Sequence, residues 1–191
     1  VVAGERFVDA TGDGDLAAWA GAPYTYGSER DEITLWCSFG KFRPDRRAAS
    51  RLYYSVVDQR SAADTTRAIV AARRQVGVFG QGDSPQFAMA TRESRHVRGR
   101  GRLGYVAMIA GSPASDAVAV FRSNVDIKGM AGSDAAMSGF VEQDFLRNWK
   151  CPIPYGTLLP QGLDNLLVTG KAYSASHDAL AMARMQADVA Q

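Results

Sequence analysis

The sequence predicts an α/β fold of the mixed α+β kind, because each end of the chain carries a strand, a turn and a helix in that order. Near the start, an apolar strand at 7–10 is followed by a glycine turn at 12–14 and a short helix at 16–20. Near the end, a buried strand at 165–170 is followed by a helix that begins near Ser176. Strands that alternate with helices are typical of α/β proteins.

The first turn also matches the G-x-G-x-x-A pattern of a dinucleotide-binding loop, through Gly12, Gly14 and Ala17. A pyrophosphate at this helix start would need bare backbone N–H groups, whereas Asp13 and Asp15 place two carboxylates there. The favoured interpretation is a capped turn in which Asp15 satisfies the first helical N–H groups. A metal site at the aspartates of this turn is favoured less.

The middle of the chain predicts elements of both kinds. We expect a half-buried strand over 33–42, a helix over 46–58, and a second helix from Ser61, where Ser61 and Asp64 form a capping box. The stretch 86–102 fits a strand or a helix equally, 104–110 predicts a strand, and 115–121 predicts a short helix. Three prolines between 151 and 162 keep that stretch extended.

Both ends indicate a fragment. The chain opens at Val1 rather than at a methionine, and the last helix, capped by Ser174 or Ser176, runs to Gln191 without a Gly, Asn or Pro stop signal. We therefore expect sequence to be missing upstream and downstream.

Composition excludes several classes of partner. Twenty-two Lys and Arg against twenty Asp and Glu give a net charge of +2, too small to recruit nucleic acid or an anionic membrane over a distance. No apolar run approaches the roughly 20 residues that span a bilayer. Cys37 and Cys151 form no C-x-x-C pair, so a reducing, cytoplasmic location is expected.

Four stretches share one resemblance. Residues 7–17 resemble the Ala-Thr-Gly segment of two-dinucleotide-binding-domain flavoproteins, and three further stretches follow in the family order. Together they resemble the FAD-dependent oxidoreductases related to the flavin subunit of heterodisulfide reductase, whereas 25–86 and 107–149 match only loosely. The three further stretches are Arg92-Glu93-Ser94-Arg95 with Gly99, then 153–160, and 162–170 continued through 174–177.

The resemblance implies the C-terminal part of a Rossmann-like FAD-binding flavoprotein. Residues 1–24 and 151–191 would belong to the FAD domain, and 25–150 would be an inserted cap or substrate region. The G-x-G-x-x-G loop that grips the pyrophosphate would lie in a missing N-terminal region, which is the expected partner of this chain. We expect the fragment to be inactive alone.

The resemblance also implies a set of cofactor contacts. The absent Cβ of Gly170 would let the backbone approach FAD closely, and the last helix would direct its N-terminus at the pyrimidine ring of the flavin. Lys171 stands where many flavoproteins place an Asp for a ribityl hydroxyl, which leaves that contact unassigned. The expected cofactor-binding residues are Thr11, Gly12, Gly170, Lys171, Ser174, Ala175 and Ser176.

His177 is the expected catalytic residue, because an imidazole in the first turn of that helix could donate to the flavin or move a substrate proton. The alternative is a polar surface histidine. Arg95, in the arginine-rich stretch 92–102, is the expected substrate contact, since guanidinium groups suit carboxylates and phosphates. Against this, Glu93 could pair with one of these arginines, and exposed arginines often decorate a solvated face. His96 departs from the Arg usual in the family motif.

Two functions compete. In the first, FAD passes a hydride or electron pair between an unidentified small-molecule substrate and an unidentified acceptor. In the second, the arginines of 92–102, with Tyr105 and Trp149 as stacking platforms, bind nucleic acid, which the net charge of +2 opposes. Some relatives carry four-iron four-sulfur clusters, but these need four thiolates, and Cys37 and Cys151 supply two. Any such cluster would have to lie in the missing upstream region.

Overall fold

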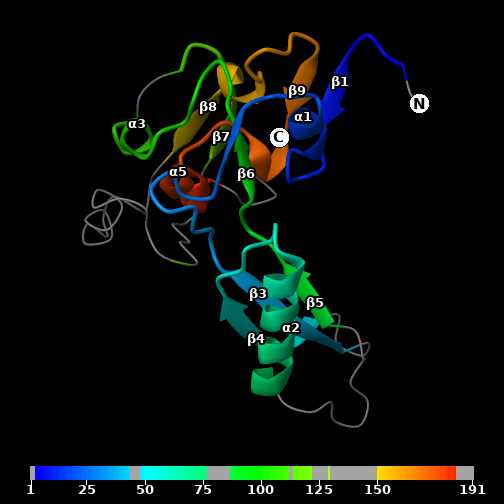
Figure 1. Ribbon diagram of the computed structural model, residues 1–191. Helices are drawn as coiled ribbons and strands as arrows, with labels where there is room; N and C mark the ends of the chain where they lie inside the picture. Colours follow the sequence, from blue (N-terminus) through cyan, green and yellow to red (C-terminus); the bar gives the residue numbers. More distant parts are fainter. Residues whose placement is uncertain are drawn as a thin grey trace.

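The computed structural model describes residues 3–43, 48–76, 87–111, 114–121, 129 and 150–183 (Figure 1). In chain order its elements are β1 (Phe7–Asp9), α1 (Asp15–Trp19), β2 (Tyr24–Tyr26), β3 (Cys37–Arg43), β4 (Ala48–Ser55), α2 (Ala62–Val76), β5 (Phe87–Ala90), β6 (Arg95–Val97), α3 (Tyr105–Ile109), β7 (Ala117–Phe121), β8 (Cys151–Pro154), the 3-10 helix η2 (Tyr155–Leu158), β9 (Leu166–Val168), the 3-10 helix η3 (Gly170–Ala172) and α5 (His177–Met182).

The two terminal strand-turn-helix units meet. β1 and β9 form a parallel pair, with Phe7 opposite Leu166 and Asp9 opposite Val168, although about 160 residues separate them in sequence. The two terminal strands are therefore parallel neighbours in one sheet. The turns that follow the two strands leave the same edge of this pair, the edge at which α/β sheets bind ligands.

A second region is a three-stranded antiparallel sheet, in the order β4-β3-β5, with α2 packed against it (Figure 1). Its core holds Cys37, Phe39, Val57, Ala68 and Ala72, all buried. Ser61 caps α2 as expected, because its Oγ accepts from Asp64 N–H at 3.2 Å. The reciprocal half of the expected capping box is not formed, since Ser61 N–H donates to the Asp58 carbonyl and Asp64 Oδ2 accepts from Asp58 N–H at 2.9 Å.

Three predicted elements are wrong, each because a tertiary partner decides the conformation. The predicted helix 46–58 is strand β4, whose Tyr53 lies opposite Phe39 of β3. The predicted helix 115–121 is strand β7, which pairs with β8. The predicted strand 104–110 is helix α3, in which Tyr105 and Met108, three positions apart, both turn into the core.

A third pair of short strands, β2 and β6, runs antiparallel and resolves part of the ambiguous stretch 86–102 as strand. The largest core cluster lies beside it and joins α3, β7, β8 and α5; it contains Leu103, Tyr105, Met108, Phe121, Cys151, Ile153, Tyr173, Ala175, Ala179, Leu180, Met182 and Ala183.

Gly99 lies where three backbone segments converge. A Cβ on Gly99 would come within 2.8 Å of the carbonyl oxygens of Gly101 and Gly156 and of Ser174 Cβ. Such contacts do not occur without movement of the surrounding backbone. The close approach fixes the segment 174–176, which leads into α5.

Candidate functional site

The turn between β1 and α1 is built around the buried carboxylate of Asp9. Its Oδ1 accepts from the backbone N–H of Thr11 at 3.0 Å and from the Thr11 hydroxyl at 2.7 Å, and its Oδ2 accepts from Ala17 N–H at 2.8 Å. The Thr11 hydroxyl in turn accepts from Asp15 N–H at 3.0 Å. The hydroxyl is therefore engaged within the turn, and the helix start is capped by Thr11 and Asp9 rather than by Asp15.

The two carboxylates that follow are neutralised by two cations. Lys171 Nζ donates to Asp13 Oδ1 at 2.6 Å and to the Gly12 carbonyl at 2.9 Å. Arg95 donates to Asp15 Oδ1 at 2.5 Å and to the Asp13 carbonyl at 3.0 Å. Burial alone would raise the pKa of Asp13, but the hydrogen bonds from Lys171 and Ser94 outweigh it, so the pKa lies below its ordinary value. The turn is charge-balanced.

Gly12, in the turn after β1, and Gly170, in the turn after β9, are close neighbours. Gly12 and Gly170 have φ values of 82° and 71°, in the left-handed region that favours glycine. A Cβ on Gly170 would lie 3.8 Å from Gly12 Cα, and a Cβ on Gly12 would lie 3.5 Å from Lys171 Nζ. The structure therefore brings Thr11, Gly12, Gly170 and Lys171 together.

The other expected cofactor residues lead from this turn to α5. Ser174 and Ala175 are buried, and the backbone of Leu103 donates to Ser174 O and accepts from Ser176 N–H, both at 2.9 Å. The side chain of Ser176 caps α5 by accepting from Ala179 N–H at 3.3 Å. Ser176 is thus the cap, and the start of the predicted helix is confirmed, whereas residues 184–191, to which the helix was predicted to run, lie outside the described residues.

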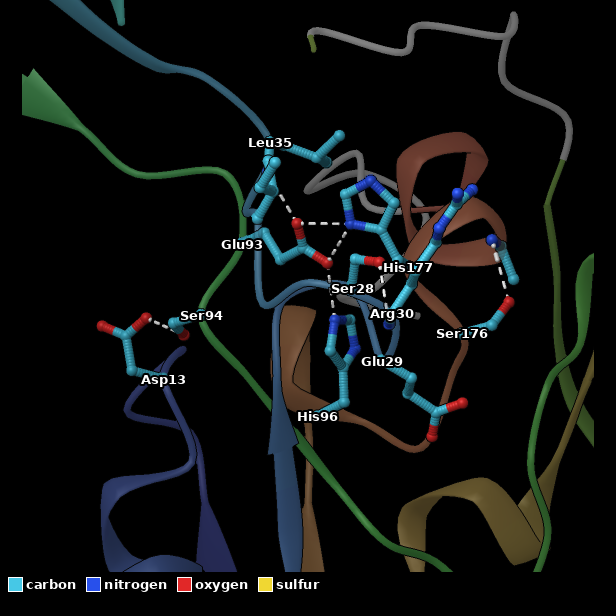
Figure 2. A network of polar contacts seen from close by, with 12 residues as sticks. Asp13, Ser28, Glu29, Arg30, Leu35, Glu93, Ser94, His96, Ser176 and His177 are labelled. Carbon is cyan, nitrogen blue, oxygen red and sulfur yellow. Dashed lines mark hydrogen bonds and ion pairs between the residues drawn. The ribbon is translucent and has the colours of Figure 1, made fainter. Parts of the chain in front are cut away.

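His177 is not a surface residue, since only 5% of it is exposed. Its Nδ1 lies 2.8 Å from both carboxylate oxygens of Glu93, which is fully buried (Figure 2). His96 Nε2 contacts Glu93 Oε1 at 2.6 Å, and Leu35 N–H donates to Glu93 Oε2 at 2.6 Å. Figure 2 shows Glu93 between the two imidazole rings.

The network keeps Glu93 ionised. Burial alone would raise the pKa of Glu93, yet the hydrogen bonds from His177 and His96 outweigh it, and the pKa lies below its ordinary value. A buried carboxylate of this kind is stable only with donors on its oxygens.

Three consecutive residues connect the turn to the histidine. Glu93 contacts His177, Ser94 Oγ donates to Asp13 Oδ1 at 2.5 Å, and Arg95 contacts the Asp13 carbonyl and the Asp15 carboxylate. The segment 93–95 therefore holds the turn after β1 and the start of α5 in one arrangement. The backbone of residue 95 belongs to β6, which positions all three.

A cavity of about 470 Å³ opens beside His177. Polar and apolar groups share its wall, and its charged side chains come from three parts of the chain. The lining residues are Ser28, Glu29, Arg30, Arg102, Gly104, Tyr105, Val106, Ala107, Ser176, His177 and Asp178.

The arginines of 92–102 do not form one basic surface. Arg92 donates to the Trp36 carbonyl, Arg95 holds the acidic turn, Arg100 pairs with Asp164, and Arg102 pairs with Glu29. Tyr105 is buried, so its ring is not exposed for stacking on a base. Trp149 lies outside the described residues. The arrangement gives no support to nucleic-acid binding.

The two cysteines occupy different cores. Cys37 packs in the core of the sheet of β3, β4 and β5, and Cys151 packs in the core that joins α3, β7, β8 and α5. Burial raises the pKa of each thiol to about 11. Within the described ranges, no group of three or more His, Cys, Asp and Glu side chains is arranged to hold a metal ion. In the same ranges, no helix is both long enough and apolar enough to cross a bilayer.

Two paired parallel strands whose glycine turns meet beyond their carboxyl ends are typical of an α/β protein, a class in which ligands commonly bind at that edge. A comparison with protein families gives the family. The chain belongs to the FAD dependent oxidoreductase family, whose model matches residues 1–78 and 59–191 and so spans the whole sequence. Searches of curated proteins and of solved structures gave no match.

Sequence reasoning missed Glu93 as the centre of this site. Its signal was present, because Glu93 follows Arg92 and precedes Arg95 in the family motif, but a carboxylate between arginines indicates an ion pair with one of them. The structure instead turns Glu93 inward to both histidines, while Arg92 and Arg95 turn to other partners.

Proposed function

We propose that this chain forms the flavin-facing part of an FAD-dependent oxidoreductase that acts on a small polar molecule, with His177 as the residue that exchanges a proton with substrate. The observation that carries the proposal is the link made by 93–95 between the glycine turn after β1 and His177. It joins the edge where a cofactor would lie to a titratable group beside a cavity. FAD, when bound, supplies the acceptor of the hydride or electron pair.

The residues of the turns fit FAD, with one restriction. Gly12 and Gly170 expose backbone at the edge of β1 and β9, and Lys171 adds a cation there. Because Asp13 and Asp15 already balance Lys171 and Arg95, the turn has no net positive charge for a pyrophosphate. We therefore assign the pyrophosphate to residues outside these two turns, and we expect Thr11 and Gly12 to contact FAD through their backbone.

His177 and the cavity fit the substrate. The backbone of 174–176 holds the start of α5 rigidly, so the imidazole is presented to the cavity in one orientation. Arg30 on the same wall suits an anionic group, whereas Arg102 pairs with Glu29 and Arg95 holds the acidic turn. A volume of about 470 Å³ suits a small molecule.

A glycine pair tests the cofactor assignment. Gly170→Ala in the purified full-length protein should lower the flavin-to-protein absorbance ratio, because the methyl group lies at the proposed cofactor edge. Gly162→Ala is the matched control, since Gly162 has φ 79° and open space around it, so it introduces the same backbone strain of about 1 kcal/mol without the contact. Equal flavin retention in both variants, or a colourless wild-type protein, would remove the assignment.

A histidine variant tests the catalytic assignment. His177→Ala should retain FAD, because the cofactor has many other contacts, yet lose on the order of 100-fold to 10,000-fold in rate. The measurement is single-turnover flavin reduction together with the flavin absorbance ratio. Unchanged reduction and reoxidation rates would leave His177 a packing residue.

A further inference from the structure

Glu93 contacts both histidines of the sequence and no cation of the arginine-rich stretch around it. We propose that Glu93 is the positioning residue for His177: it fixes the proton on Nδ1 and leaves Nε2 as the one ring atom through which His177 takes up and releases a proton. The proposal rests on the function assigned to His177 above.

The positions of the two rings around Glu93 determine which ring nitrogens carry a hydrogen. An ionised carboxylate only accepts hydrogen bonds, so each ring nitrogen that faces Glu93 must carry a hydrogen. The facing atoms are Nδ1 of His177, at 2.8 Å, and Nε2 of His96, at 2.6 Å. The geometry therefore requires opposite protonation patterns in the two rings: His177 carries its hydrogen on Nδ1 and His96 carries its hydrogen on Nε2.

The surroundings of His96 divide the roles of the two rings. His96 is buried, and its Nδ1 has no hydrogen-bond partner among the described residues. A hydrogen on that atom would be a buried donor without a partner, which is costly, so we give His96 the role of a fixed donor to Glu93 through Nε2. His177 is then the ring whose protonation changes, and it is the ring that borders the cavity.

Glu93 acts on His177 through its charge as well as through the hydrogen bond. A carboxylate in hydrogen-bond contact favours the charged imidazolium, so Glu93 also raises the affinity of His177 for a proton. Other charged and titratable groups share the cavity wall with His177 and also influence its protonation. These groups are Glu29, Arg30, Arg102, Tyr105 and Asp178.

The first test is ¹⁵N NMR of the two imidazole rings in the wild-type full chain. Because the sequence holds only His96 and His177, the signals are assigned by His96→Gln alone. At a pH above the titration of His177, we expect Nδ1 of His177 and Nε2 of His96 to be the protonated atoms. A protonated Nε2 on neutral His177 would overturn the proposal, and this measurement needs no variant at position 93 to fold.

The second test is Glu93→Gln, with Glu32→Gln as a matched control. Glu32 undergoes the same chemical change, but it is exposed and pairs with Arg60 at 2.8 Å. Glu93→Gln should lower the pKa of His177 by about 1 unit or more, whereas Glu32→Gln should leave it unchanged. In the FAD-loaded protein, the pH profile of flavin reduction should shift by the same interval.

The two proposals fail separately. An unshifted His177 titration in folded Glu93→Gln would overturn the role of Glu93 while leaving flavin binding intact. A wild-type protein that binds no flavin, but carries a hydrogen on Nδ1 of His177 and on Nε2 of His96 as expected, would overturn the proposed function. The role of Glu93 toward His177 would still stand.

Discussion

The sheet of β3, β4 and β5 with α2 is held together by a different kind of interaction from the site around Asp9 and Glu93. The sheet region is continuous in sequence and buries aromatic and aliphatic side chains such as Phe39 and Val57. The site region is assembled from 9–17, 93–96 and 170–177, and its central side chains are carboxylates. The first is a hydrophobic unit with local pairing, and the second is a polar network with long-range pairing.

The two regions should therefore differ in how they respond to single substitutions. Buried polar groups stabilise only when every partner is in position, so they fix geometry more strongly than they add stability. Apolar contacts are less directional and stabilise in proportion to the area buried. The region that must hold a ligand is therefore the one that is most sensitive to single polar changes.

The largest effect is expected in the sheet region. Phe39→Ala should lower the free energy of unfolding by about 3–5 kcal/mol, because Phe39 is fully buried and packs on Tyr53. Urea unfolding measures this, with exposed Val56→Ala as the control. If the two regions are independent, the folded variant keeps its flavin and its ¹⁵N signal from His177. Loss of both would show that the site depends on the packing of the sheet.

A somewhat smaller loss is expected from Asp9→Ala, about 2–4 kcal/mol, because the change leaves the N–H groups of Thr11 and Ala17 without their acceptor. Unlike Phe39→Ala, it should also abolish flavin retention. Asp164→Ala removes another aspartate, one that is 97% exposed and paired with Arg100, and should change stability by less than about 1 kcal/mol. Equal losses from the two aspartates would contradict the role given to the turn.

An intermediate effect is expected from Gly99→Ala, about 1–3 kcal/mol, since the added methyl group would meet backbone at 2.8 Å. The strain falls on 174–176, so the ¹⁵N signal of His177 should move while the amides of β3–β5 keep their hydrogen-exchange protection. Gly4→Ala is the control, because its added Cβ would meet its nearest neighbour, the Phe7 ring, at an ordinary contact distance of 3.4 Å. A shift in both regions would show that they are mechanically coupled.

The smallest change in the free energy of unfolding is expected from protonation of Glu93 at acidic pH. The pKa of Glu93 is lower in the folded protein than its ordinary value of 4.5, so its contribution to stability is complete above pH 4.5 and is lost as the pH falls through the folded-state pKa. Chemical denaturation of wild type and Glu93→Gln between pH 7 and 3 measures the contribution as a difference. A difference that grows on acidification would contradict an ionised Glu93.

Sequence patterns predicted the elements whose conformation is decided locally. β1 with α1, the capped helix α2, and β9 with α5 carry turn residues and caps that act within a few positions. β4, β7 and α3 were predicted wrongly because their neighbours in space, β3, β8 and α5, decide their conformation.

The same limit applied to the site. The family motif indicated Thr11, Gly12, Gly170, Lys171 and His177, and the structure gathers these residues into two adjoining places. What no local pattern contained was the connection between those places. It is made by 93–95, about 80 residues distant in sequence from each side.

The pairing of β1 with β9 has a consequence for how the protein is made. The ribosome adds roughly 5–20 residues per second, so β1 waits on the order of 10–30 s before residues 166–168 exist to pair with it. During that interval the sheet of β3, β4 and β5 can close with its own neighbours. The apolar region can thus fold early in synthesis, whereas the pair of β1 and β9 forms only after β9 has been made, with His177 following shortly after it in the chain.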